Sequence, residues 1–149
     1  MLSDVLKKEY IKLNAECKDW IEAIKTAGQV LIDNGVVTEE YVEEAIKGVK
    51  ELGPYIVITK GVALPHATNK IGVNKTGIAL LTLKNPVEFG NVDNDPVYYV
   101  FMLATTDMDS HLAALSNLSD LLAKQEFFEV MKNAKDAQSV IDYIKANEN

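Results

Sequence analysis

Two histidines stand where runs of apolar residues end, and they are the only imidazoles in the chain. His66 follows the run Gly61-Val62-Ala63-Leu64-Pro65, and His111 follows Ser110 at the start of a leucine-rich segment. Proline restricts the residue before it to extended backbone and offers no amide hydrogen to a sheet, so the predicted strand must end at Pro65. We therefore expect His66 on a loop at the edge of a sheet, where its imidazole is accessible as a nucleophile or base near neutral pH.

The two imidazoles meet only if the strands before them are neighbours that point the same way. Those predicted strands are Gly61–Leu64 and Val97–Ala104. α/β proteins commonly place their sites at such an edge of the sheet. The helix that begins near Ser110 adds unsatisfied amides and a partial positive charge, which suit a phosphate group. Two histidines beside an anion site indicate phosphoryl chemistry, and the alternative is that His66 only supports a turn while His111 only begins a helix.

A metal site is a second interpretation of the same residues. Asp107, Asp109 and His111 alternate before the helix and could join His66 as oxygen and nitrogen ligands. Alternation brings side chains together in a strand but not across a loop that enters a helix, and the sequence has neither an HExxH motif nor a pair of cysteines. It also has no nucleophile elbow and no Walker-type glycine loop. We therefore expect no metal and no cofactor.

The composition is that of a globular protein with an acidic balance of charge. The 149 residues fit one domain, 1–149, that buries a core without disulfides, and Cys17 is the only cysteine. The formal net charge of −7 argues against nucleic acid or an anionic membrane as the main ligand and favours a basic protein partner. No apolar run approaches the roughly 20 residues that cross a bilayer, and the N-terminus has no signal-peptide core. We expect a cytoplasmic protein without direct membrane insertion.

Apolar residues recur at spacings of three and four in the first and last thirds of the chain, which predicts helices that each bury one face. The expected helices are Lys18–Asn34, closed by Gly35; the stretch from Thr38 to Gly53; Ser110–Lys124, with Ser110 as the N-cap; Phe127–Met131; and the stretch opened by Asp136.

The middle of the chain is rich in β-branched, aromatic and leucine residues and predicts a sheet. The expected strands are Tyr55–Ile58, Gly61–Leu64, Gly77–Leu83 and Val97–Ala104, with turns and room for a short edge strand between the last two. Because the last two strands are apolar at nearly every position, helices must cover both faces of the sheet. We predict an α/β fold, a single-domain sandwich with a central mixed β-sheet flanked by helices on both faces.

Two motifs together resemble a known family. The segment Gly61–His66 and the segment Ser110–Leu118 are similar to those of the EIIA components of the mannitol/fructose class, the type-2 EIIA, in the bacterial phosphoenolpyruvate-dependent sugar phosphotransferase system. Within that class, the L-ascorbate type is most similar in Gly53–Ile58, in the alanine after the histidine, and in the stretch from Phe89 to Val97.

The resemblance implies a phosphotransferase that acts as a phosphocarrier. It makes His66 the residue that accepts a phosphoryl group from the carrier protein HPr and passes it to a cysteine of EIIB, which drives uptake and phosphorylation of a sugar together with the membrane component EIIC. His111 becomes the second active-site histidine, and Ser110 and Lys50 become further candidates for phosphoryl binding. Lys50 stands where mannitol-type members often carry an arginine. Lysine offers a point charge, whereas the guanidinium of arginine donates two parallel hydrogen bonds. The implied sugar is L-ascorbate. A regulatory EIIA homologue that signals by binding, or a metal-dependent hydrolase, is the alternative.

Overall fold

The computed structural model describes residues 1–107 and 109–148, without the side chain of Ser110. Within them a five-stranded sheet is formed by β1 (Ile11–Ala15), β2 (Val57–Thr59), β3 (Val62–Ala63), β4 (Gly77–Val87) and β5 (Val97–Ala104). The strand order is β1-β4-β5-β3-β2. The sheet is mixed, because β1 with β4 and β3 with β5 are parallel pairs, whereas β4 with β5 and β2 with β3 are antiparallel.

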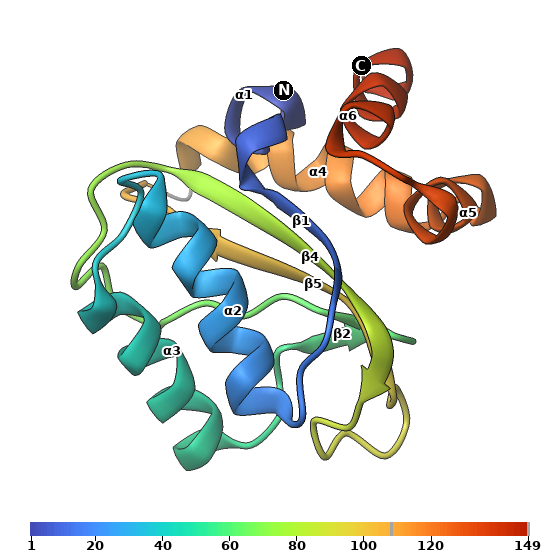
Figure 1. Cartoon of the computed structure of the whole chain (residues 1–149). Coiled ribbons are helices and arrows are strands. Elements are labelled where there is room, and N and C mark those ends of the chain that lie inside the picture. The colour runs from blue at the N-terminus through green and yellow to red at the C-terminus, as the bar shows by residue number, and fades with distance from the viewer. Residues whose placement is uncertain (108, 149) are drawn as a thin grey trace.

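Helices cover both faces of this sheet. They are α1 (Leu2–Val5), α2 (Trp20–Asp33), α3 (Glu39–Leu52), α4 (Leu112–Leu122), α5 (Gln125–Asn133) and α6 (Ala137–Asn147), with 3₁₀ turns at Lys8–Tyr10 and Asp109–His111. In Figure 1, α2 and α3 lie on one side of the sheet, and α1, α4, α5 and α6 lie on the other. No helix in the described ranges has the length and apolar character needed to span a membrane. The predicted α/β sandwich with a mixed central sheet is confirmed.

Strand β4 shows why two layers of helices are needed. Ala79, Leu81 and Leu83 belong to the buried cluster that α2 and α3 cover. Ile78 and Leu80 belong to the cluster on the opposite face. Successive side chains of a strand point to opposite faces, so a strand that is buried at every position from 77 to 83 requires cover on both.

The helix ends follow from local side-chain and backbone chemistry. The Asp19 carboxylate accepts a hydrogen bond from the first turn of α2, and the Asp136 carboxylate does the same for α6. Gly35 and Gly53 follow α2 and α3 with φ of 72° and 87°, a region that favours glycine. The ends at Gly35, Gly53 and Asp136 agree with the predicted ones, whereas α2 begins at Trp20 and not at the predicted Lys18.

Two elements near the N-terminus, α1 and β1, were not predicted. β1 is an edge strand of five residues whose burial alternates only weakly, and Asn14 within it has a φ of 57°. Its register against β4 shifts between Lys12 and Ala15. A short, irregular edge strand lacks the continuous apolar run that marks the central strands, so its sequence signal is weak.

Several predicted boundaries are wrong, including those of β2, predicted at Tyr55–Ile58, and of β3, predicted at Gly61–Leu64. β4 continues past Leu83 through Pro86 to Val87. Its register against β5 shifts between Thr82 and Val87, which accommodates Pro86, a residue with no amide hydrogen to donate to the neighbouring strand. Ser110 is not the N-cap of the leucine-rich helix: a 3₁₀ turn over Asp109–His111 comes first, and His111 is the N-cap of α4.

The parallel pairing of β3 with β5 fixes where both histidines emerge. Val62 lies opposite Tyr99, and Ala63 lies opposite Val100. The amide of Leu103 donates to the carbonyl of Pro65 at 2.9 Å, so the two chains stay paired up to the residue before the first histidine. The strands before His66 and His111 are therefore neighbours that point the same way, as the sequence-based hypothesis requires.

The packing of α2 against α3 depends on a glycine. A β-carbon at Gly28 would lie 2.5 Å from Cγ2 of Val42. We expect Gly28→Ala to lower the free energy of unfolding by about 1–3 kcal/mol through overpacking. This loss opposes the intrinsic preference of a helix for alanine over glycine, which is about 1 kcal/mol. The matched control is Gly48→Ala in α3, where the β-carbon would meet only the Tyr55 hydroxyl, at 3.3 Å. Urea denaturation should show loss of stability in the first variant alone, and equal stability of the two variants would contradict this account.

Candidate functional site

His66 lies on the loop directly after the paired end of β3. Pro65 is buried and still bound to β5 through its carbonyl, whereas His66 is half-buried. The chain thus holds the histidine at the sheet edge by a backbone that is fixed one residue earlier. This is the position predicted from the Pro65-His66 pair.

Two contacts fix the orientation of the His66 ring. Nδ1 lies 2.7 Å from the carbonyl oxygen of Leu64. Because a carbonyl only accepts, Nδ1 carries the proton and donates it. The ring of Tyr55 packs edge-on against the imidazole, with centroids 5.7 Å apart and an interplanar angle of 88°. In the neutral ring this arrangement leaves Nε2 unprotonated, with a lone pair that is available for nucleophilic attack.

A small cavity of about 150 Å³ lies beside His66. The loop residues Ala67, Thr68, Asn69 and Lys70 line it on one side, and Tyr41, Leu103 and Thr105 line it from α3 and the end of β5. Lys70 therefore brings a cationic side chain to the cavity that the imidazole also lines. Its size fits a small anionic group better than a sugar.

Tyr41 connects the loop after His66 to the sheet. Its hydroxyl donates to the carbonyl of Leu103 on β5 and accepts a hydrogen bond from the amide of Ala67 at 3.1 Å. Burial raises the pKa of Tyr41 above its ordinary value, and the hydrogen bond from Ala67 opposes this shift. The hydroxyl therefore stays protonated at neutral pH, as it must to donate and accept at once.

His111 is tied to the same edge of the sheet by two threonines. Its Nε2 lies 2.9 Å from Oγ1 of Thr76, and this oxygen lies 3.0 Å from Oγ1 of Thr105. Thr76 directly precedes β4 and Thr105 directly follows β5, which pair in antiparallel fashion with Gly77 opposite Ala104. Since Thr105 also lines the cavity at His66, a short chain of hydroxyl groups joins the two histidines' surroundings.

The two further candidates for phosphoryl binding have different positions. Ser110 lies in the 3₁₀ turn before α4, and its side chain lies outside the described part of the chain. Lys50 is exposed in the last turn of α3. Lys70, which sequence reasoning missed, is the lysine that lines the cavity.

The metal interpretation finds no support in the described residues. Within residues 1–107 and 109–148, no group of three or more histidine, cysteine, aspartate or glutamate side chains is placed to hold an ion. The Asp107 carboxylate accepts a hydrogen bond from the amide of Asp109 at 3.1 Å, as in a local turn. His111 directs Nε2 to Thr76 instead. The alternation of aspartates before His111 is therefore part of a loop that enters a helix.

Several residues of this site carried no sequence signal of their own. Tyr41 reads as one more buried position of an amphipathic helix. In the sequence, Thr76 and Thr105 only flank predicted strands. The register of β4 against β5 brings them together. Tyr55 falls at the start of a predicted strand but lies against His66. One sequence signal could have pointed to the two threonines. One of them directly precedes a predicted strand, and the other directly follows the next long strand.

Comparisons with known proteins show the family of this chain. The family model described as "Phosphoenolpyruvate-dependent sugar phosphotransferase system, EIIA 2" matches residues 4–147. The ascorbate-specific PTS system EIIA component of Escherichia coli K12 is 37% identical over 135 residues, which cover 90% of this chain and 88% of that protein.

Solved structures show the same fold. The mannitol-specific cryptic phosphotransferase enzyme IIA from Escherichia coli is 34% identical, with a TM-score of 0.83 and coverage of 97% of this chain and 98% of that one. Enzyme IIA for mannitol from the same organism, solved in complex with phosphorylated enzyme IIB, has a TM-score of 0.81 over 95% of this chain and 99% of that one. At 24% identity, the latter shows the fold alone. The chain belongs to the EIIA 2 family of the phosphoenolpyruvate-dependent sugar phosphotransferase system, and it is a phosphotransfer component of that system.

Proposed function

We propose that Nε2 of His66 is the atom that carries the phosphoryl group. The hydrogen bond from Nδ1 to the Leu64 carbonyl supports this most strongly, because it assigns the proton to one ring nitrogen and the lone pair to the other. Attack by Nε2 forms a nitrogen–phosphorus bond while the bond to the donor's histidine breaks, and the donor nitrogen keeps the electron pair. The phosphorylated ring bears positive charge, which the Leu64 carbonyl stabilises through the Nδ1 hydrogen.

Stabilisation of the phosphoryl oxygens comes from groups around the cavity. Lys70 lines the cavity and supplies a positive charge. For His111 we assign the donor role in the Thr76 contact to the Thr76 hydroxyl, which places the proton of the neutral ring on Nδ1 and leaves that N–H for a phosphoryl oxygen. The amide of Ala67 is bound to the Tyr41 hydroxyl and is not free to donate. Phosphoryl transfer needs little covalent work from the protein, so positioning and charge stabilisation dominate the rate. Ser110 and Lys50 stay candidates for the same task.

The partners are proteins on both sides of the transfer. We take the donor to be the phosphohistidine of HPr and the acceptor to be the cysteine of an EIIB component, which serves the membrane component EIIC. The Escherichia coli enzyme IIA of similar fold was solved together with phosphorylated enzyme IIB, which supports the second assignment. Nucleic acid and the bilayer itself have no part in this function.

The sugar we propose is L-ascorbate, on the basis of the 37% identical ascorbate-specific relative. A cavity of about 150 Å³ beside His66 has room for a phosphoryl group, so the protein selects its sugar through the EIIB that it recognises. A direct test is to offer the phosphorylated chain purified EIIB of an ascorbate system and of a mannitol system. Faster transfer to the ascorbate EIIB supports the assignment, and a preference for the mannitol EIIB contradicts it. A regulatory homologue would transfer to neither.

His66 should be the residue that accepts phosphate. With phosphoenolpyruvate, enzyme I and HPr, the chain should gain one phosphoryl group, and His66→Ala should gain none because the acceptor nitrogen is gone. Intact-mass spectrometry followed by mapping of the modified residue measures this. His111→Ala, which keeps His66, should still gain one phosphoryl group after prolonged incubation, although more slowly. Full labelling of His66→Ala, or phosphate mapped to Ser110, would refute the assignment.

A second prediction separates His111 from His66. His111→Ala removes one N–H from a preorganised site but leaves the acceptor atom, so phosphorylation should persist at a rate about 10²–10³ lower. His111→Gln can keep an amide N–H near the same place and should retain more transfer. Stopped-flow or quench-flow rates with HPr as donor measure both variants. A rate in His111→Ala equal to that of the unmodified chain would place His111 outside the site.

Thr76 should act as a positioning residue for His111. Thr76→Val keeps the shape but loses the hydroxyl that contacts Nε2, so the His111 ring loses its anchor and transfer should slow by about tenfold, the effect of roughly one hydrogen bond. Thr76→Ser keeps the hydroxyl and should restore the rate. Nitrogen-15 NMR of the His111 ring provides a second readout, since the Nε2 resonance should shift in the valine variant alone. An unshifted resonance together with an unchanged rate would show that the hydroxyl has no such role.

A further inference from the structure

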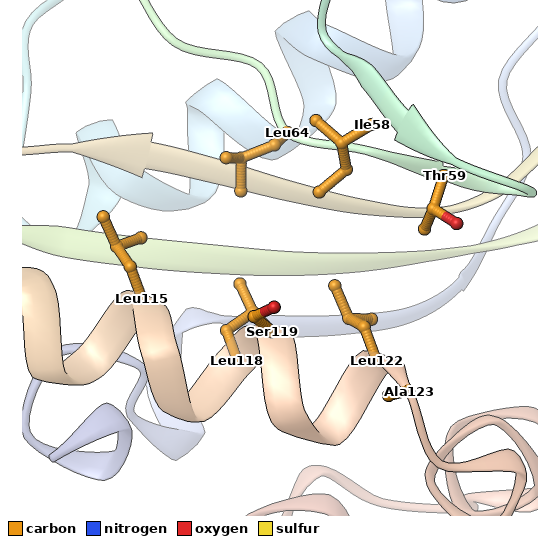
Figure 2. Close-up of a pocket in the computed structure, with 8 residues that line it drawn as sticks. All are labelled: Ile58, Thr59, Leu64, Leu115, Leu118, Ser119, Leu122 and Ala123. Carbon is orange, nitrogen blue, oxygen red and sulfur yellow. The ribbon is translucent and has the colours of Figure 1, made fainter.

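Two hollows of different character lie beside the segment that carries His66. The larger, of about 520 Å³, lies between β2 and α4, and Figure 2 shows the apolar side chains of Leu64 on one side of it and Leu115 on the other. The smaller, of about 150 Å³, is lined by His66 itself, and its other lining residues include Thr68, Asn69, Lys70 and Thr105. Phosphoryl oxygens require hydrogen-bond donors or positive charge, so the smaller cavity is the one suited to bind them.

Two donors around the smaller cavity already serve the fold. The Tyr41 hydroxyl donates to the carbonyl of Leu103, and the amide of Ala67 donates to that hydroxyl. Donors for phosphoryl oxygens must therefore come from other lining residues. Thr105 is one of these, and it stands on the fixed backbone directly after β5.

The hydrogen bonds around Thr105 define where its hydroxyl hydrogen points. With the Thr76 hydroxyl as the donor to Nε2 of His111, the single hydrogen of Thr76 is used in that contact. The hydroxyl oxygens of Thr76 and Thr105 lie 3.0 Å apart, so in this second contact Thr105 donates and Thr76 accepts. The Thr105 oxygen also accepts a hydrogen bond from the amide of Asp107 at 3.1 Å. Donation thus runs in one direction, from the Asp107 amide through the two threonines to His111.

The hydrogen of Thr105 is the member of this chain that can change its acceptor. The amide of Asp107 holds the oxygen in place, whereas the hydrogen rotates about the C–O bond. Its acceptor in the structure is a neutral hydroxyl oxygen, and a hydrogen bond to an ionised acceptor is roughly twice as strong as one between neutral groups. A phosphoryl group on His66 would bring anionic oxygens into the cavity that Thr105 lines, where they compete for this hydrogen.

We propose that Thr105 binds the phosphoryl group of phosphorylated His66, with its hydroxyl hydrogen turned from Thr76 to a phosphoryl oxygen. The inference rests on the proposed function, because it requires the phosphoryl group on Nε2. Thr76 keeps its hydrogen bond to His111, since the hydrogen of that contact does not move. The new contact exists only in the phosphorylated form, so it stabilises that form relative to the unmodified one.

The equilibrium of phosphoryl exchange with HPr measures this contact. Thr105→Val keeps the shape of the side chain without the hydroxyl, Thr105→Ala removes the same hydroxyl with a smaller side chain, and Thr105→Ser keeps it. Thr106→Val is the matched control, because Thr106 is exposed in the same loop and is not among the residues that line the cavity. Each variant is mixed with phospho-HPr, and intact-mass spectrometry gives the phosphorylated fraction of both proteins at equilibrium.

We expect the valine and alanine variants to shift this equilibrium toward phospho-HPr by about tenfold or more, the effect of losing a hydrogen bond to a charged group. The serine variant and the Thr106→Val control should match the unmodified chain. Phosphorus-31 NMR gives a second readout, since the phosphohistidine resonance should move in Thr105→Val and stay in place in Thr106→Val.

A double-mutant cycle with Thr76 separates direct contact from an effect through His111. If Thr105 acted only by supporting Thr76 and His111, Thr105→Val would have no further effect in the Thr76→Val background. Direct contact with the phosphoryl group predicts that the equilibrium still shifts by about tenfold in that background.

An exchange equilibrium unchanged in the valine and alanine variants would overturn the inference. A shift that vanishes in the Thr76→Val background, or one that Thr105→Ser shows as strongly, would overturn it as well. All three results leave His66 as the acceptor. Failure of the unmodified chain to gain phosphate on His66 would instead overturn the proposed function itself.

Discussion

The parallel pairing of β3 with β5 is the constraint on which the rest of the site depends. β3 is only two residues long, yet its register against β5 and the hydrogen bond from Leu103 to Pro65 hold it in place. Because parallel strands leave a sheet at the same edge, the loop with His66 and the turn with His111 must emerge together. An antiparallel arrangement of these two strands would send the histidines to opposite edges.

Emergence at the edge of the sheet does not by itself orient the His66 ring for the proposed phosphoryl transfer, and the surrounding contacts do so. The Leu64 carbonyl assigns the proton of His66, and Tyr55 limits rotation of the ring. Tyr41 holds the following loop against β5 with a hydroxyl that burial keeps protonated. These contacts are present without a partner, so the side chains of the site do not need to reorganise during transfer.

Sequence reasoning succeeded where one residue type decides local structure. Pro65 ends a strand because it has no amide hydrogen to donate to the sheet, so the position of His66 was predictable from its neighbour. Apolar positions on both faces of β4 and β5 likewise required two helical layers, which the structure has.

It failed where the decisive fact is a contact between distant segments. Thr76 and Thr105 meet only through the register of β4 and β5, and Tyr41 reaches the loop after His66 only because α3 packs beside it. The edge strand β1 and the turn that displaces Ser110 from the N-cap are short, and their stability comes from tertiary packing rather than from local preference. Such short features produce no periodic pattern of apolar residues in the sequence.

The central claim is that the backbone of Leu64 selects the reactive nitrogen of His66. Long-range proton–nitrogen NMR spectra of the ring, recorded before and after phosphorylation by HPr, test it directly. The account predicts a proton on Nδ1 in the unmodified chain and phosphate on Nε2 afterwards, with the Nδ1 proton retained. Phosphate on Nδ1, or an unmodified ring whose proton resides on Nε2, would contradict it.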